Sequence, residues 1–157
     1  DFDVKGKVDR FKAGIDLGSI VKEREDAWSI IDSLILCKFM RGACSTYDKF
    51  AELYKLVTGT KIAPEEMRKA GERIYNLEKA YNVREGWTKK DDYPPPRVMK
   101  DPIPDGAAKG SVVSKREFDL MLNAYFEARG WSKDGIPTRQ KIAELELEGV
   151  TEEAGNI

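Results

Sequence analysis

Apolar residues recur at helical spacing along most of this chain of 157 residues. Residues three and four positions apart share one face of an α-helix, so an apolar stripe with this period predicts a helix that packs on a core. Five stretches show the pattern: residues 21–40, 45–59, 64–81, 114–130 and 138–147. The pattern therefore predicts an all-α fold with four or five helices.

Capping residues support several of these boundaries. Ser45 or Thr46 can cap the second helix, and Gly59 suits the position just after its end. Ser114 and Glu117 have the spacing of a capping box in front of the fourth helix. These signals predict helices that begin and end close to the limits of the apolar stripes.

The segment 83–113 interrupts the helical pattern. It holds five of the seven prolines, and proline disfavours helix both at its own position and at the residue before it. We expect a long extended arm without a continuous helix, which runs over the surface of something larger and makes few contacts with the helical body. Gly14 and Gly18 predict a leading segment without a stable helix over residues 1–20, and residues 149–157 read as a frayed tail.

Length and composition narrow the class of protein. The length suits one domain over residues 1–157, and the net charge of −1 argues against a globally basic nucleic-acid binder. No apolar stretch approaches the roughly 20 residues that span a bilayer, and the polar start shows no export signal. We therefore expect a cytoplasmic protein. Since the chain begins without Met, we also expect a processed or truncated piece of a longer one.

The chain contains no histidine. It therefore cannot form a Ser-His-Asp or Cys-His triad, or a zinc site with histidine ligands. Any general acid or base must be a carboxylate, Lys, Tyr or Cys. If the chain belongs to an enzyme, we expect much of the chemistry to lie outside it, and no catalytic residue is assigned within it.

The stretch "IIDSLILCKF" places Asp32 and Cys37 in an otherwise apolar run. An unpaired buried carboxylate is costly, so Asp32 either forms a local hydrogen bond or binds a ligand. Cys37 is either a small core residue, as free cysteines commonly are, or a ligand. Positions five apart lie about 140° from each other on a helix, so either the helix ends between them or a ligand spans a wide arc. Cys44 is expected to be a free thiol.

Trp87 stands among charged residues in "REGWTKKDD". We expect its ring to anchor a loop rather than to bind a nucleobase. The sequence contains no GxGxxG, P-loop or HExxH motif. It therefore shows none of these nucleotide-binding or zinc-binding signatures.

Five segments in order resemble the C-terminal region of the tungsten-containing aldehyde ferredoxin oxidoreductase family. They are "DSLILCKF", "YDKFAELYKLVTG", "KAGERIYNLEKAYNVREGWTKKDD", "PIPDGAAKG" and "RGWSKDGIPTR". Together they place the resemblance over roughly residues 20–147, which is most of the chain. The resemblance implies that this is the C-terminal, all-α domain of a larger protein.

The resemblance also implies cofactors. Members of the family bind tungsten, or in some members molybdenum, between two pterin dithiolenes, next to one [4Fe–4S] cluster. The family motif of type D-x-x-G-L-C reads "DSLILC" here, with Ile35 in place of its glycine. By resemblance Cys37 is a cluster ligand, Asp32 accepts hydrogen bonds from a pterin, and Leu36 contributes to the cofactor site. The other cluster cysteines lie upstream in the family.

The implied function of the whole protein is the oxidation of an aldehyde to a carboxylic acid, with ferredoxin as electron acceptor. Its implied partners are the N-terminal and middle domains of the same enzyme, and a second copy of the enzyme in a homo-oligomer is a further implied partner. The isolated chain is expected to be inactive. Two alternatives stay open. One is a family member with another substrate, such as an aromatic acyl-CoA, and the other is a helical interaction domain without redox activity.

Overall fold

The computed structural model describes residues 14, 16–39 and 46–149, and it confirms the predicted all-α class. The described residues form no β-strand, and none of their helices is long and apolar enough to cross a membrane. The elements are α1 (Asp16–Ser33), α2 (Tyr47–Thr58), α3 (Pro64–Arg84), the 3₁₀ helix η2 (Lys89–Asp92), α4 (Pro96–Lys100), α5 (Lys115–Arg129) and α6 (Arg139–Glu144).

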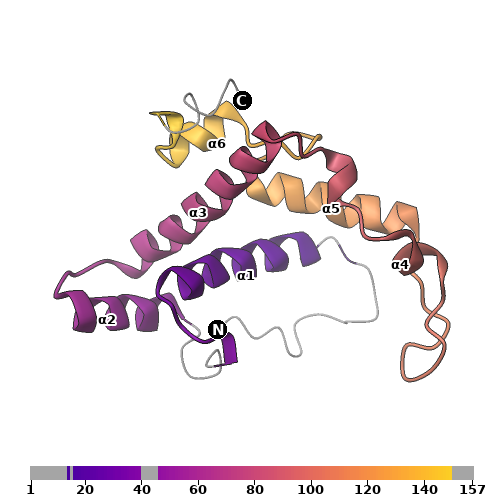
Figure 1. Ribbon diagram of the computed structural model, residues 1–157, viewed down its shortest axis with the longest axis horizontal. Helices are drawn as coiled ribbons and strands as arrows, with labels where there is room; N and C mark the ends of the chain where they lie inside the picture. The colour runs from indigo at the N-terminus through magenta and orange to yellow at the C-terminus, as the bar shows by residue number, and fades with distance from the viewer. Residues whose placement is uncertain (1–13, 15, 40–45, 150–157) are drawn as a thin grey trace.

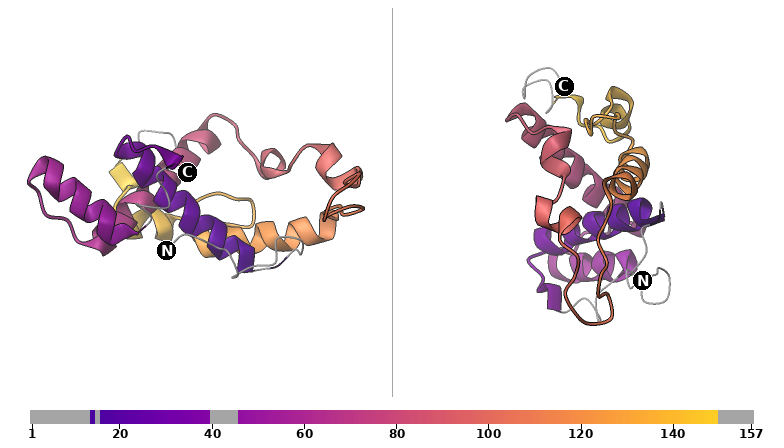
Figure 2. Two further views of the ribbon diagram at one scale, coloured as in Figure 1. Left: turned by 90° about the horizontal axis from the view of Figure 1, so that it is seen from below. Right: turned by 90° about the vertical axis from the view of Figure 1, so that its right-hand side faces the viewer.

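Helix α1 is the centre of the arrangement, because it packs against both α3 and α5 (Figure 1). Helix α2 packs mainly on α3, and α6 lies above α3 in the view of Figure 1, while α4 lies toward the other end of the molecule (Figure 1). The segment with η2 and α4 leaves α3 and returns to α5 through a loop that projects beyond the helices (Figure 2). Part of this segment therefore projects from the helices, as the predicted arm does.

Three groups of buried apolar residues hold these helices together. The first lies between α1, α2 and α3, the second surrounds the end of α5, and the third fastens α6. In that order the groups are Ala27, Ile30, Ile31, Phe50 and Met67; Leu122, Phe126 and Trp131; and Ile142, Leu145 and Leu147. The periodic stripes read from the sequence supply most of these residues.

Two glycines allow α1 to approach its neighbours closely. A Cβ at Gly18 would lie 2.6 Å from the backbone nitrogen of Tyr125, and one at Gly71 would overlap the carbonyl oxygen of Asp26. Gly18 therefore sits inside α1, at its contact with α5, and the prediction of a leading segment without helix up to residue 20 is wrong from Asp16 onward. Residues 1–13 lie outside the described residues.

A network of buried charges joins α1 to α5. Arg129 and Asp26 are both fully buried, and their side chains form an ion pair. Arg129 also donates to Glu25 at 2.7 Å, and Lys22 pairs with Asp26 at 2.8 Å. A buried charge without a partner is strongly destabilising, so each of these groups requires the others.

The same network extends to α3 and α6 through Glu72. Its carboxylate lies 3.4 Å from Lys22 and accepts from Lys141 at 3.2 Å. Burial raises the pKa of Glu72, but the two ammonium groups outweigh it, so the pKa lies below the ordinary value. Four helices thus share one connected set of charges.

The segment between α3 and α5 differs in part from the predicted arm. Helix α3 continues to Arg84, and the segment contains no helix longer than the five residues of α4. The expectation of few contacts is wrong for its first part. Lys79 pairs with Asp92 at 2.9 Å, and the indole N–H of Trp87 donates to Asp92 at 3.0 Å. Trp87 therefore anchors the loop, as predicted.

We predict that Gly71→Ala destabilises the protein by about 1–3 kcal/mol, because the new methyl group meets backbone that cannot move aside. Chemical denaturation measures the effect. Gly14→Ala is the control, since nothing lies within 4 Å of an added Cβ there. Equal stability of wild type and Gly71→Ala would contradict the close approach of α1 and α3.

Candidate functional site

The candidate site begins where α1 ends. The helix stops at Ser33, earlier than the predicted limit near residue 40. Ile35 has a left-handed backbone with φ 55°, its N–H donates to the carbonyl of Asp32 at 3.0 Å, and the N–H of Leu36 donates to that of Ile31 at 2.9 Å. This pair of bonds is the Schellman motif that closes helix C-termini. Of the two possibilities for Asp32 and Cys37, the structure therefore has the helix ending between them.

Three other helices end in the same way, and the residues they use show what this ending requires. Helices α3 and α5 end with Gly86 and Gly130 in the left-handed conformation, and α6 ends with Glu146 at φ 56°. In each case the next residue bonds back to a carbonyl five positions earlier. Ile35 thus occupies a position that glycine fills best, because a β-branched residue is strained there. The glycine of the family motif falls at this position.

Asp32 lies on the surface at the last turn of α1. Its side chain is 62% exposed, and its Oδ2 accepts from the ammonium of Lys38 at 2.9 Å. The apolar run around Asp32 suggested a buried carboxylate, but the buried face of the helix passes through Ile30 and Ile31 instead. Within the described residues, Asp32 is thus an exposed carboxylate with one cationic partner.

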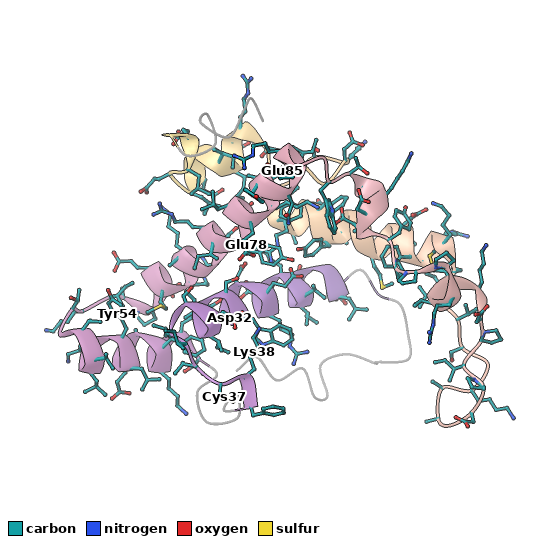
Figure 3. All side chains as sticks on the ribbon, viewed as in Figure 1. Asp32, Cys37, Lys38, Tyr54, Glu78 and Glu85 are labelled. Atoms are coloured by element: carbon teal, nitrogen blue, oxygen red, sulfur yellow. The ribbon has the colours of Figure 1, made fainter. Side chains whose placement is uncertain are left out.

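Cys37 is a free and exposed thiol, so its interpretation as a small core residue is wrong. Leu36, one residue earlier, is half-buried and packs on the apolar group around Ile31. Leu36 therefore fixes the chain at this point, and Cys37 projects outward beyond it (Figure 3). Cys44 lies outside the described residues.

A groove of about 500 Å³ runs beside Asp32 between α1 and α3. Its walls carry three carboxylates, one lysine and an indole, with serines at the rim. The lining residues are Glu25, Trp28, Ser29, Asp32, Ser33, Lys38, Ile74, Tyr75 and Glu78. Burial, followed by the charge of Glu25, raises the pKa of Tyr75 to about 12, so Tyr75 is a neutral hydrogen-bonding group at physiological pH. The groove therefore combines acidic and aromatic surface.

A second groove of about 530 Å³ adjoins the first and is more apolar. The two share Glu25, Tyr75 and Glu78, and the second continues toward Trp87 and Trp131. Tyr125 donates to Glu25 at 2.6 Å where the grooves meet. Sequence reasoning missed Glu25, Tyr75 and Glu78, because each lies on a helix whose pattern indicated only solvent-facing charge or core.

No group of three or more His, Cys, Asp or Glu side chains that could hold a metal ion occurs in the described part of the chain. The end of α1 presents one exposed thiol, Cys37, and one exposed carboxylate, Asp32. The fold and the site define an all-α unit whose described residues do not form a metal site by themselves.

Comparisons with known proteins identify the family to which this helical unit belongs. The sequence profile described as "Aldehyde ferredoxin oxidoreductase, domains 2 & 3" matches residues 2–147. The tungsten-containing aldehyde ferredoxin oxidoreductase of Pyrococcus abyssi is 34% identical over 125 residues, which cover 79% of this chain and 20% of that protein. The aliphatic sulfonate oxidoreductase, WOR-like subunit, of Pyrococcus furiosus is 29% identical over 120 residues, with 73% and 19% covered.

A solved structure is similar over the same region. The active-site complex BamBC of benzoyl coenzyme A reductase, in complex with 1,5-dienoyl-CoA, superposes with a TM-score of 0.70. The two sequences are 25% identical, and the matched region covers 88% of this chain and 20% of the chain in the reductase complex. The chain belongs to the aldehyde ferredoxin oxidoreductase family, a family of oxidoreductases, and it spans about 20% of the length of the Pyrococcus abyssi relative.

We predict that Ile35→Gly stabilises the protein by about 1 kcal/mol. Glycine removes the left-handed strain, and Ile35 is 93% exposed, so little packing is lost. Thermal unfolding measures the effect. Ile35→Ala keeps a Cβ and serves as the matched control with a much smaller gain. A lower melting temperature for Ile35→Gly would show that Ile35 is not strained.

Proposed function

We propose that this chain forms part of a tungsten-pterin, iron–sulfur oxidoreductase that converts aldehydes into carboxylic acids. The family assignment supports the class of enzyme, and the names of the Pyrococcus relatives support tungsten and ferredoxin. The observation that carries the proposal is the end of α1, where Asp32 and Cys37 are both exposed on either side of a tight helix ending. That ending coincides with the family's cofactor motif.

Cys37 supplies one thiolate to a [4Fe–4S] cluster in this proposal. An exposed thiol held by a fixed backbone suits a ligand, because a cluster requires its cysteines at set positions before it binds. Leu36 fixes that position by packing inward while Cys37 projects outward. The remaining ligands come from other domains of the enzyme, which also explains why the isolated chain is expected to bind neither iron nor tungsten and to be inactive.

Asp32 binds the pterin in this proposal. An ionised carboxylate only accepts hydrogen bonds, and the amino and ring N–H groups of a pterin are donors. Lys38 donates to Oδ2 of Asp32, and no other described residue donates to this carboxylate. Its Oδ1 can therefore accept a hydrogen bond from the pterin. By the same resemblance Leu36 belongs to this site, and its side chain, which packs on the apolar group around Ile31, supports the chain between the two functional residues.

Cys37 and Asp32 would help to hold these cofactors, which would supply the oxidation of the aldehyde, with oxygen from water, and the route for the electrons to ferredoxin. The contribution of this chain is structural and electrostatic: the helix ending of α1 orients one pterin contact and one cluster ligand, both of which face outward from the chain. Its partners are the other domains of the enzyme and ferredoxin.

A second substrate class has its own support. The similar solved structure belongs to a benzoyl coenzyme A reductase complex, which suggests an aromatic acyl-CoA as the alternative. Assays of the full-length enzyme with aliphatic and aromatic aldehydes and with benzoyl-CoA separate the two. We expect oxidation of aldehydes with reduction of ferredoxin, and turnover of benzoyl-CoA alone would replace the first proposal by the second.

The role of Cys37 is tested in the full-length protein. We predict that Cys37→Ala removes or damages the cluster, because one of its four thiolates is lost. Iron content and electron paramagnetic resonance measure the effect. Cys44→Ala is the matched control, and we expect it to be nearly silent.

Two outcomes count against the proposed function. A spectroscopically normal cluster in Cys37→Ala would exclude this residue as a ligand. Absence of both the cluster and tungsten from the wild-type full-length protein would favour the helical interaction domain without redox activity.

A further inference from the structure

A groove of about 980 Å³ lies between the helices α1 and α5 and the projecting segment, which comprises α4 and the loop after it (residues 96–113). Val98, Ile103 and Val112 line the groove from the projecting segment, and Leu17 and Met121 line it from the two helices. The first three remain 46%, 44% and 43% exposed. Single exposed apolar residues are ordinary, but several that share one groove mark an interaction site. The described residues therefore leave a concave aliphatic surface uncovered.

Hydrogen bonds within the chain fix the shape of the projecting segment. Just before it, Tyr93 donates to Asp119 of α5. Within it, the N–H of Ile103 donates to the carbonyl of Ser111 at 3.1 Å, and the N–H of Gly110 donates to the carbonyl of Ile103 at 2.8 Å. Because these bonds order the backbone in the absence of a partner, binding costs little conformational entropy. The groove is thus a preformed surface.

The prolines of the projecting segment indicate how a partner binds. Pro102 and Pro104 both line the groove, and proline has no backbone N–H to donate. A partner strand therefore cannot pair continuously with this edge, as an extended peptide does when it adds to a sheet. The charged lining residues are Arg97, Asp101 and Glu117, and most of the others are aliphatic. The groove thus suits the apolar face of a helix, whose backbone hydrogen bonds are already made.

We propose that this groove is the docking surface for another domain of the same enzyme, which inserts the aliphatic side chains of a helix into it. The matched region covers 20% of the Pyrococcus abyssi relative, so most of such an enzyme lies outside this chain. Interfaces between permanent partners are more apolar than others, whereas transient electron-transfer contacts are small. The projecting segment also lies well apart from Cys37 (Figure 3), so the groove does not serve a ferredoxin that approaches this residue. The docking role follows from the family assignment and does not require the roles proposed for Asp32 and Cys37.

Alkylation of an introduced cysteine tests whether the groove is covered in the folded, full-length enzyme. We expect the new thiol in Ile103→Cys to react about tenfold more slowly than that in Lys109→Cys, because a covered thiol reacts only when the contact opens. Lys109 is the matched position, since it is exposed in the same segment but does not line the groove. Mass spectrometry of the labelled peptides keeps both thiols apart from Cys37 and Cys44. Equal rates in the two variants would overturn the proposal.

A photo-cross-linker at the same position identifies what covers the groove. We expect p-benzoylphenylalanine at position 103 to form a cross-link to a peptide of the enzyme outside residues 1–157. A cross-link to ferredoxin or to a second copy of the enzyme, which doubles the mass, overturns the proposal. Cross-links only within residues 1–157, or none at all, overturn it as well. These outcomes are independent of the result for Cys37→Ala, which tests the proposed function.

Discussion

The ion pair between Arg129 and Asp26 is the interaction on which the arrangement of the helices depends. Both side chains are fully buried, and each would be left as an uncompensated charge if the other were displaced. Because Asp26 lies at the middle of α1 and Arg129 at the last turn of α5, the pair fixes how these helices cross. Glu25, Lys22 and Tyr125 complete the hydrogen bonding of the pair.

The same constraint explains why apolar packing alone does not describe the core. Lys22 and Lys141 both reach Glu72, so the charge network joins α1, α3 and α6 where the apolar groups remain separate. The network requires the helices to lie close, and Gly18 and Gly71 provide that closeness at the two crossings of α1. Charge pairing and small residues therefore act together to position α1, and with it the candidate site at its end.

The candidate site combines a rigid backbone with exposed functional groups. The Schellman ending is held by two backbone hydrogen bonds and by the packing of Leu36, while Asp32, Cys37 and Lys38 face outward. The end of α1 therefore presents polar and charged groups on a backbone of fixed conformation.

The sequence by itself determined the features that depend on neighbours along the chain. The caps at Thr46 and Ser114 and the ends of α2 and α5 follow from local hydrogen bonding and backbone preference, and they lie where predicted. The proline-rich segment was likewise predicted to lack a long helix, because proline acts on its own and the preceding residue. The family motif at residues 32–37 was readable for the same reason.

Only the tertiary structure decided the features that depend on residues far apart in the chain. Gly18 lies within α1 because α5 needs a close approach there, and α1 ends at Ser33 because Leu36 packs back on Ile31. The acidic partners of Arg129, Asp26 and Glu25, are more than 100 residues away from it, so no local pattern could reveal them. Side-chain charge and burial at such contacts are set by the assembled helices, whereas periodicity records only which face of each helix is apolar.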